Sequence, residues 1–259
     1  MDLNTIRKTE KNVAAIILAA GLGTRMESRK AKVLHELNGQ PMVTYVVETA
    51  KKCVKDNIVL VIGNQAETVR NIVSQHFKVN FALQDGPLGT GHAVLSALPY
   101  LSDDIEQVVI LCGDVPLITA DTVLELIIDH LSAQRDITVL GGKIDNPKGY
   151  GRILFDENRH IIGIVEESEA TKQQKRIKII NSGTYCMKKD FLFDSINKIK
   201  PDNIKGEFYL TDIIKIGYSE GKNIGVLIGS NINEVLGINT QQDLKRVENM
   251  MKSRSSEKS

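Results

Sequence analysis

The sequence predicts an α/β fold built on a doubly wound, Rossmann-like mixed sheet that is mostly parallel. Three short runs rich in Val and Ile are apolar at nearly every position, namely residues 13–19, 58–62 and 108–112. Such runs are typical of strands that are covered on both faces. Segments of helical period lie between the runs, and strands that alternate with helices indicate repeated βαβ units.

The helices expected in this part of the chain follow the apolar periodicity. Thr119 and Asp121 are candidate caps for the last of them, because short polar side chains accept hydrogen bonds from the first free amides of a helix. The expected helices span residues 42–53, 66–75, 92–98 and 122–131.

After about residue 141 the pattern changes. Gly149, Gly151 and Asn158 punctuate two short runs, at residues 152–155 and 161–166, which we interpret as a β-hairpin lying over the sheet. The elements expected beyond it are a strand at 177–187, a helix at 206–219, a strand at 224–228 and a closing helix at 240–251.

Composition and charge exclude several classes of protein. Thirty-three Lys and Arg against 32 Asp and Glu give a formal charge of +1, so no global field attracts nucleic acid or an anionic membrane. Cys53, Cys112 and Cys186 form no Cys-x-x-Cys pair and lack zinc-type spacing, which favours a reduced, cytoplasmic setting.

The apolar run after Lys8 and Lys11 imitates a signal peptide but is short. No apolar segment reaches the ~18 to 20 residues needed to span a bilayer, so we expect a soluble protein.

A glycine-rich turn directly follows the first expected strand, with the sequence Leu18-Ala19-Ala20-Gly21-Leu22-Gly23-Thr24-Arg25. Ligands of such sheets bind beyond the carboxyl ends of the strands, and glycines let backbone amides approach a phosphate closely. The spacing fits neither a dinucleotide fingerprint, which needs a third glycine, nor a P-loop, which needs Gly-Lys followed by Ser or Thr. Taken alone, the turn is equally well explained as a plain tight turn.

Two basic residues, Arg25 and Lys32, follow the turn. Cations held near a polyphosphate stabilise the charge that builds on a leaving pyrophosphate. The alternative is a solvated basic face that also includes Arg29 and Lys30, which is the usual role of such a run.

Asp114 ends the most uniformly apolar strand. A carboxylate at the end of a buried strand is costly to desolvate unless it binds a cation or caps a turn or helix. Magnesium is commonly bound by one or two carboxylates together with substrate phosphates, so a single aspartate suffices. A turn cap and a metal ligand are equally good interpretations of Asp114 by itself.

A series of motifs in fixed order makes the pattern specific. The chain resembles the uridyltransferase domain of the bacterial bifunctional N-acetylglucosamine-1-phosphate uridyltransferase and glucosamine-1-phosphate acetyltransferase, from about Val13 to Met251. The motifs are LAAGLGTR from Leu18, KVLH from Lys32, Gln84, LGTGH from Leu88, GDVPL from Gly113, GYGR from Gly149, GIVE from Gly163, NSG from Asn181, GEFYLTD from Gly206 and GIN from Gly237.

The resemblance implies a role for each matching residue. It implies a fold of the nucleotide-diphospho-sugar transferase type. Arg25 and Lys32 would be the catalytic cations that neutralise the phosphates, and Asp114 and Asn239 would bind a Mg²⁺. Gln84 and the Gly89-Thr90 backbone would contact the uracil. The whole nucleotide would be held by Leu18, Ala19, Ala20, Gly21, Gly23, Gln84, Gly89 and Thr90. The sugar pocket would be lined by Gly151, Glu166, Asn181, Tyr209 and Thr211.

Each of these residues also has a structural interpretation. Gly151 suits a hairpin turn, Tyr209 suits a core, and Asn181 and Asn239 suit caps. Only together do the residues favour function.

The implied reaction requires no general base. A phosphate oxygen of the sugar 1-phosphate, already ionised at neutral pH, would attack the α-phosphorus of UTP in line and expel pyrophosphate. The enzyme then supplies positioning and charge neutralisation. A capping or core role is the better interpretation of His35 and His92.

The resemblance also sets the expected organisation. Residues 13–251 would form the nucleotidyltransferase domain, with a nucleotide-binding part at 13–140, a sugar-binding lobe at 141–239 and the closing helix at 240–251, between polar, disordered tails at 1–12 and 252–259. The sequence shows no hexapeptide repeat. We therefore expect no acetyltransferase activity, and a monomer or weak oligomer that binds small molecules rather than nucleic acid or membranes.

Four positions depart from the family pattern, and other functions stay open. Cys112 replaces a common tyrosine or similar residue before Gly-Asp, and Ser182 replaces threonine; both concern the detail of the pocket rather than the reaction. Leu22 stands where the family usually has lysine or another polar residue, and Ala31 stands where proline normally precedes the lysine. The rival functions are a pyrophosphorylase for another hexose 1-phosphate, such as a glucose-1-phosphate uridylyl- or thymidylyltransferase, and a non-catalytic nucleotide-binding domain. A dinucleotide-dependent oxidoreductase fails on the missing third glycine.

Overall fold

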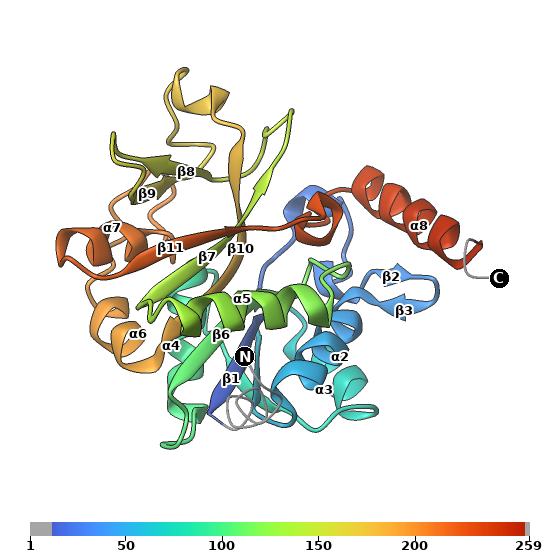
Figure 1. Cartoon of the computed structure of the whole chain (residues 1–259). Helices are drawn as coiled ribbons and strands as arrows, with labels where there is room; N and C mark the ends of the chain where they lie inside the picture. Colours follow the sequence, from blue (N-terminus) through green and yellow to red (C-terminus); the bar gives the residue numbers. More distant parts are fainter. Residues whose placement is uncertain (1–11, 257–259) are drawn as a thin grey trace.

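A mixed, twisted sheet with helices on both faces forms the centre of the molecule (Figure 1). The computed structural model describes residues 12–256. The main sheet has the strand order β11-β7-β10-β6-β1-β4-β5. Its strands are β1 (Val13–Leu18), β4 (Ile58–Ile62), β5 (Asn80–Leu83), β6 (Gln107–Cys112), β7 (Ile137–Lys143), β10 (Ile179–Lys188) and β11 (Ile224–Ile228).

Along this strand order, one strand runs opposite to the rest. Strands β6, β1, β4 and β5 run parallel to one another, and β11 runs parallel to β7. Only β10 is antiparallel to its neighbours β6 and β7. The expected mixed, mostly parallel sheet is thereby confirmed.

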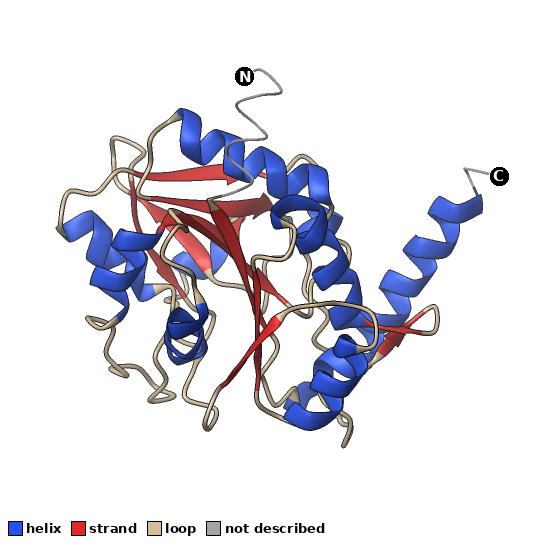
Figure 2. Ribbon diagram, turned by 90° about the horizontal axis from the view of Figure 1, so that it is seen from below, coloured by secondary structure: helices blue, strands red, loops and turns tan. Residues whose placement is uncertain are grey.

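Helices cover the sheet because alternate strand residues point to opposite faces (Figure 2). The helices are α2 (Met42–Val54), α3 (Ala66–Ser74), α4 (Thr90–Ala97), α5 (Ala120–Ser132), α6 (Lys189–Ile196), α7 (Asp212–Ser219) and α8 (Gln241–Ser256). In β1, Ala15 and Ile17 pack into the hydrophobic cluster that contains residues of α2, α3 and α5, whereas Ala14 and Ile16 pack into the cluster that contains residues of α4, α6 and α7.

Two small β-structures lie outside the main path. The hairpin of β8 (Arg152–Phe155) and β9 (Ile161–Val165) joins the sheet through an antiparallel pairing of Arg152 with Ile180 in β10. It is therefore attached to a strand edge and does not simply lie over the sheet. The second is a short hairpin of β2 (Glu36–Leu37) and β3 (Gln40–Pro41), which contacts α8 at one end of the molecule (Figure 1).

Several expected boundaries differ from the structure. The boundary near residue 141 falls inside β7, so the second half of the chain shares the main sheet. Helix α7 begins at Asp212, because residues 206–211 are not helical and their backbone bonds to Leu88 and Gly91. Helix α8 runs to Ser256, beyond the expected end at Met251 and into the tail expected to be disordered. Residues 1–11 of the other tail lie outside the described residues.

A buried histidine ties α5 to the sheet. His130 is 1% exposed, and its ring nitrogens lie 3.0 Å from Thr138 Oγ1 and 3.0 Å from Gln107 Oε1. A neutral ring with its proton on Nε2 satisfies both contacts. Burial, with smaller contributions from Lys188 and Arg135, lowers the pKa of His130 to about 4.

This shift predicts a pH-dependent stability. A folded-state pKa below the ordinary value of 6.5 means that the unfolded chain binds a proton first, so stability is complete above pH 6.5 and falls as the pH decreases toward 4. We expect His130 to reduce the free energy of unfolding by about 2 kcal/mol between pH 7 and pH 5. Urea unfolding at both pH values should show this loss, and His130→Gln should remove it. An equal loss in the variant would contradict the assignment.

Candidate functional site

The site lies where the carboxyl ends of β1 and β6 meet. Leu18 pairs with Cys112 at the last positions of these adjacent parallel strands. The glycine-rich turn leaves β1 here, and Asp114 follows β6. The chain runs from β1 outward through β4 to β5 and then returns to β6 on the other side of β1, so the carboxyl ends of β1 and β6 form a switch point of the sheet, where α/β proteins bind their ligands.

A nucleotide-sized pocket opens over the glycine-rich turn. All eight residues expected to bind a nucleotide line it: Leu18, Ala19, Ala20, Gly21, Gly23, Gln84, Gly89 and Thr90. Lys32 and Asp114 also line it. The remaining lining residues, to which no binding role was assigned from the sequence, are Leu22, Thr24, Val33, Pro87, Ala93, Cys112 and Glu207.

Gly23 is required by the packing of this turn. Its φ of +64° favours glycine, and a Cβ there would collide with Lys32 Cβ. The turn therefore lies directly against Lys32. Ala31, where the family has proline, keeps a φ of −54° that proline could adopt. Its amide donates to Gln65 Oε1 at 3.1 Å, a hydrogen bond that proline could not form.

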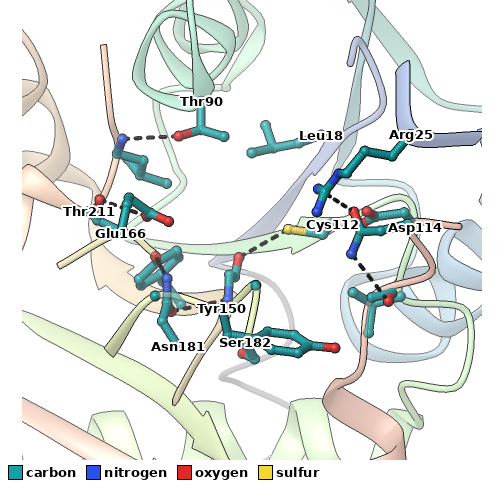
Figure 3. Close-up of a pocket in the computed structure, with 18 residues that line it drawn as sticks. Leu18, Arg25, Thr90, Cys112, Asp114, Tyr150, Glu166, Asn181, Ser182 and Thr211 are labelled. Carbon is teal, nitrogen blue, oxygen red and sulfur yellow. Dashed lines mark hydrogen bonds between the residues drawn. The ribbon is translucent and has the colours of Figure 1, made fainter. Parts of the chain in front are cut away.

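A second pocket adjoins the first. It contains four of the five residues expected to bind a sugar, Gly151, Glu166, Asn181 and Thr211. Figure 3 shows Glu166, Asn181 and Thr211 on one side of this pocket and Arg25 with Asp114 on the other. The lining also includes Tyr150 and Tyr185, which the sequence did not identify. Tyr209 does not line either pocket and is only 8% exposed, which agrees with its interpretation as a core residue.

The polar groups of the second pocket are held by neighbours. The Thr211 hydroxyl donates to Glu166 Oε1 at 3.2 Å. Burial is the largest effect on Glu166 and raises the pKa of its carboxyl group. Asn181 Nδ2 donates to Tyr185 Oη at 2.7 Å, and Asn181 Oδ1 accepts from the Gly183 amide at 3.0 Å. These bonds fix the side chain of Asn181 while one of its amide protons remains available to a ligand.

Two cations and two oxygen ligands converge between the pockets. Lys32 Nζ forms an ion pair with Asp114 Oδ2 and donates to Asn239 Oδ1 at 2.7 Å. Arg25 Nη2 donates to the same Asn239 oxygen at 2.8 Å. The backbone holds the two oxygen ligands together, because the Ile238 amide donates to the Asp114 carbonyl at 2.9 Å. The four residues come from three distant parts of the sequence.

The donor set at this point fits a magnesium ion. The Lys32 ammonium contacts Asp114 Oδ2 and Asn239 Oδ1, so both oxygens already face a positive charge. In the described part of the chain, no group of three or more His, Cys, Asp and Glu residues could hold a metal. An ion here would have two protein oxygens and would take its other ligands from water and phosphate, which is the usual arrangement for Mg²⁺.

Cys112 lies where the two pockets join. Its thiol donates to the Gly183 carbonyl at 3.4 Å. Burial, followed by the charge of Asp114, raises the pKa of Cys112 to about 12. The thiol therefore stays protonated at neutral pH, which excludes a cysteine nucleophile.

Fold and site together define a nucleotidyltransferase. A glycine-rich turn with two adjacent cations faces a second pocket that is lined by polar side chains. The sequence profile of the MobA-like NTP transferase domain matches residues 15–177. The chain belongs to this family, as its motifs predicted.

Comparisons with known proteins agree with this assignment. The chain is 46% identical over 247 residues to the bifunctional protein GlmU of Geotalea uraniireducens, covering 94% of the chain and 53% of that protein. It is 40% identical over 248 residues to GlmU of Caldanaerobacter subterraneus subsp. tengcongensis, covering 96% of the chain and 53% of the relative. The chain thus spans about half the length of the curated relatives it matches.

A solved structure shares the fold. A Bacillus anthracis protein assigned as a glucose-1-phosphate thymidylyltransferase, crystallised with a sucrose, superposes with a TM-score of 0.73 at 22% identity. The likeness covers 92% of this chain and 94% of that one, and it confirms the fold class. In residues 12–256, no helix is both long and apolar enough to cross a bilayer.

The position of Lys32 predicts competition with a divalent cation. In Lys32→Met, Asp114 loses its ammonium partner, so an added ion no longer has to displace it. We expect saturating MgCl2 to raise the melting temperature of this variant more than that of the wild type, by about 2 °C or more, which corresponds to on the order of 1 kcal/mol of binding free energy. Differential scanning fluorimetry measures the shift. The double variant Lys32→Met with Asp114→Asn is the control and should show no such increase in melting temperature. Equal Mg²⁺-induced shifts in Lys32→Met and in the wild type would contradict the prediction that the ion and the Lys32 ammonium compete for one position.

Proposed function

We propose that the protein transfers the uridylyl group of UTP to N-acetyl-α-D-glucosamine 1-phosphate, giving UDP-N-acetylglucosamine and pyrophosphate. One observation carries the proposal: the two pockets are contiguous and share Leu18, Thr90, Cys112 and Asp114. A sugar phosphate in one pocket and a nucleoside triphosphate in the other would therefore bring their phosphates together beside Asp114.

The first pocket suits a nucleoside triphosphate. The turn from Gly21 to Thr24 offers backbone amides to phosphates, and Lys32 supplies a positive charge at this end. The nucleoside would lie toward Gln84 and Gly89, where a side-chain amide can recognise the edge of a base. The resemblance of these motifs to those of uridyltransferases supports uracil as the base.

The second pocket suits a neutral sugar carrying a phosphate. Glu166 can accept hydrogen bonds from sugar hydroxyl groups, and Asn181 can donate its remaining amide proton. Gly151 has no side chain, and a Cβ placed on it would lie 3.5 Å from the Glu166 carboxyl oxygens. Glycine thus leaves the approach to this carboxylate open. The match of Glu166 and Asn181 to the family motifs supports an acetamido sugar.

The transfer itself would depend on charge neutralisation between the pockets. The acceptor phosphate is already ionised, so its oxygen can attack the α-phosphorus without a general base while pyrophosphate leaves. Arg25 and Lys32 would stabilise the negative charge that develops on the phosphates. Asp114 and Asn239 would hold Mg²⁺, which when bound would supply positive charge that neutralises part of the phosphate charge. The scaffold supplies the alignment of the two substrates.

Pyrophosphate release from the purified protein tests the proposed reaction. With Mg²⁺ and UTP, we expect release with N-acetylglucosamine 1-phosphate and at least about tenfold less with glucose 1-phosphate, because Asn181 and Glu166 would lose an acetamido partner. Equal rates with both sugars would overturn the proposed substrate. Release with glucose 1-phosphate and thymidine triphosphate alone would favour the rival thymidylyltransferase. No release from a folded sample with any pair would favour a binding domain.

Asp114→Asn tests the metal role. Loss of the carboxylate charge should reduce turnover at saturating Mg²⁺ by about 100-fold or more, corresponding to roughly 3 kcal/mol of transition-state stabilisation. The fold should be retained, because asparagine keeps the shape and can still contact Asn239. Steady-state kinetics and circular dichroism are the measurements. Asp121→Asn, on the first turn of α5, is a matched control and should keep wild-type turnover. Unchanged turnover in Asp114→Asn would refute the metal role.

A further inference from the structure

A single stretch of backbone borders both pockets. Glu207 lines the nucleotide pocket, whereas Leu210 and Thr211 line the sugar pocket. We name residues 207–211 the linking segment. It precedes α7, which begins at Asp212.

The linking segment is hydrogen-bonded to the start of α4. The Phe208 amide donates to the Leu88 carbonyl at 2.8 Å, and the Gly91 amide donates to the Phe208 carbonyl at 2.7 Å. A third bond uses a side chain: the Leu210 amide donates to Thr90 Oγ1 at 3.0 Å. Figure 3 shows this bond, with Thr90 facing the pocket.

Two glycines permit this close approach. A Cβ at Gly89, whose φ is +102°, would lie 2.6 Å from the Phe208 carbonyl oxygen and 2.8 Å from the Phe208 amide nitrogen. A Cβ at Gly91 would lie 3.0 Å from the same oxygen. Both glycines therefore serve the contact with the linking segment, and Gly89 in addition borders the nucleotide pocket.

Each end of this contact continues to a ligand-facing group. On the nucleotide side, Gln84 Nε2 donates to the Gly89 carbonyl at 3.0 Å. On the sugar side, the Thr211 hydroxyl donates to Glu166 at 3.2 Å. A displacement of the linking segment would therefore change the position of groups in both pockets. Among the described residues, Thr90 is the one side chain that both lines the two pockets and bonds to the linking segment.

We propose that Thr90 is a positioning residue whose hydroxyl, through the Leu210 amide, couples binding in the nucleotide pocket to binding in the sugar pocket. This proposal rests on the proposed function for the identity of the two ligands. A nucleotide that contacts the start of α4 would fix Thr90 and the linking segment, so that Thr211 and Glu166 are already in place for the sugar phosphate. Coupling between two sites is reciprocal and is measured as a ratio of affinities.

Substitutions of Thr90 distinguish the effect of losing its hydrogen bond from the effect of changing the shape of its side chain. Thr90→Val keeps the branched shape but removes the acceptor, leaving the Leu210 amide without its partner. Thr90→Ser keeps the acceptor. Thr90→Ala removes it with less bulk and serves as a second variant. Ser96→Ala removes a hydroxyl from the same helix, where Ser96 Oγ donates to the His92 carbonyl at 3.0 Å, and is the matched control.

Calorimetric titration tests the coupling without turnover. The affinity for N-acetylglucosamine 1-phosphate is measured with Mg²⁺, in the absence and presence of saturating α,β-methylene UTP, which cannot transfer its uridylyl group. In the wild type we expect the analogue to tighten sugar-phosphate binding by about fivefold or more, within the usual range for coupled sites. In Thr90→Val and Thr90→Ala the ratio should fall to less than about twofold, whereas Thr90→Ser and Ser96→Ala should keep the wild-type ratio.

The outcomes distinguish this proposal from the proposed function. A wild type that binds neither ligand would show that the proposed function is wrong. A wild type that binds both ligands independently would overturn the coupling alone. Coupling that persists in both Thr90→Val and Thr90→Ala would remove the role of Thr90. A merely structural effect of Thr90 would weaken both affinities and leave their ratio unchanged, and this result would also overturn the proposal.

Discussion

The contact of Lys32 with Asp114 and Asn239 is the interaction on which the site depends. It joins the turn after β1, the end of β6 and the residues before α8, which are far apart in the sequence. The side chains of Lys32 and Asp114 are only 13% and 21% exposed, so each charge needs the other or a substitute for it. A cluster that compensates its own charges can remain partly buried between two pockets. Its carboxylate can accept another cation in place of the ammonium, and the released ammonium can bind an anion such as phosphate.

The sheet makes this geometry rigid. Leu18 and Cys112 are in register on adjacent strands whose surrounding residues are fully buried, so the turn and Asp114 leave the sheet side by side. Strand β10, which contributes Asn181, Ser182, Gly183 and Tyr185 to the second pocket, belongs to the same sheet. The two pockets are therefore parts of one packed body. For a phosphoryl transfer without a general base, such fixed alignment is the main contribution that a protein can make.

Missed or misplaced elements have identifiable physical causes. β7 was overlooked because Gly141 and Gly142 resemble a turn, yet here the missing side chains make room for Ile228 and Ile232. β5 is an edge strand with mostly exposed residues and lacks a buried pattern. Residues 206–211 have helix-like apolar spacing, but their backbone bonds to Leu88 and Gly91 replace helical ones. In each case a distant segment decided the local conformation.

The sequence by itself determined most of the buried strands and most of the helices, because burial on both faces and helical periodicity leave local signals. The residues expected around the nucleotide pocket followed from the glycine-rich turn together with the resemblance of the ordered motifs to a known family. Most of the sugar residues followed from motif order rather than from any local signal. Only the tertiary structure decided that Lys32 reaches Asp114 and Asn239, that Tyr209 belongs to the core and that Thr90 meets Leu210. The physical reason is that each of these contacts joins residues whose separation in space is set by the whole sheet.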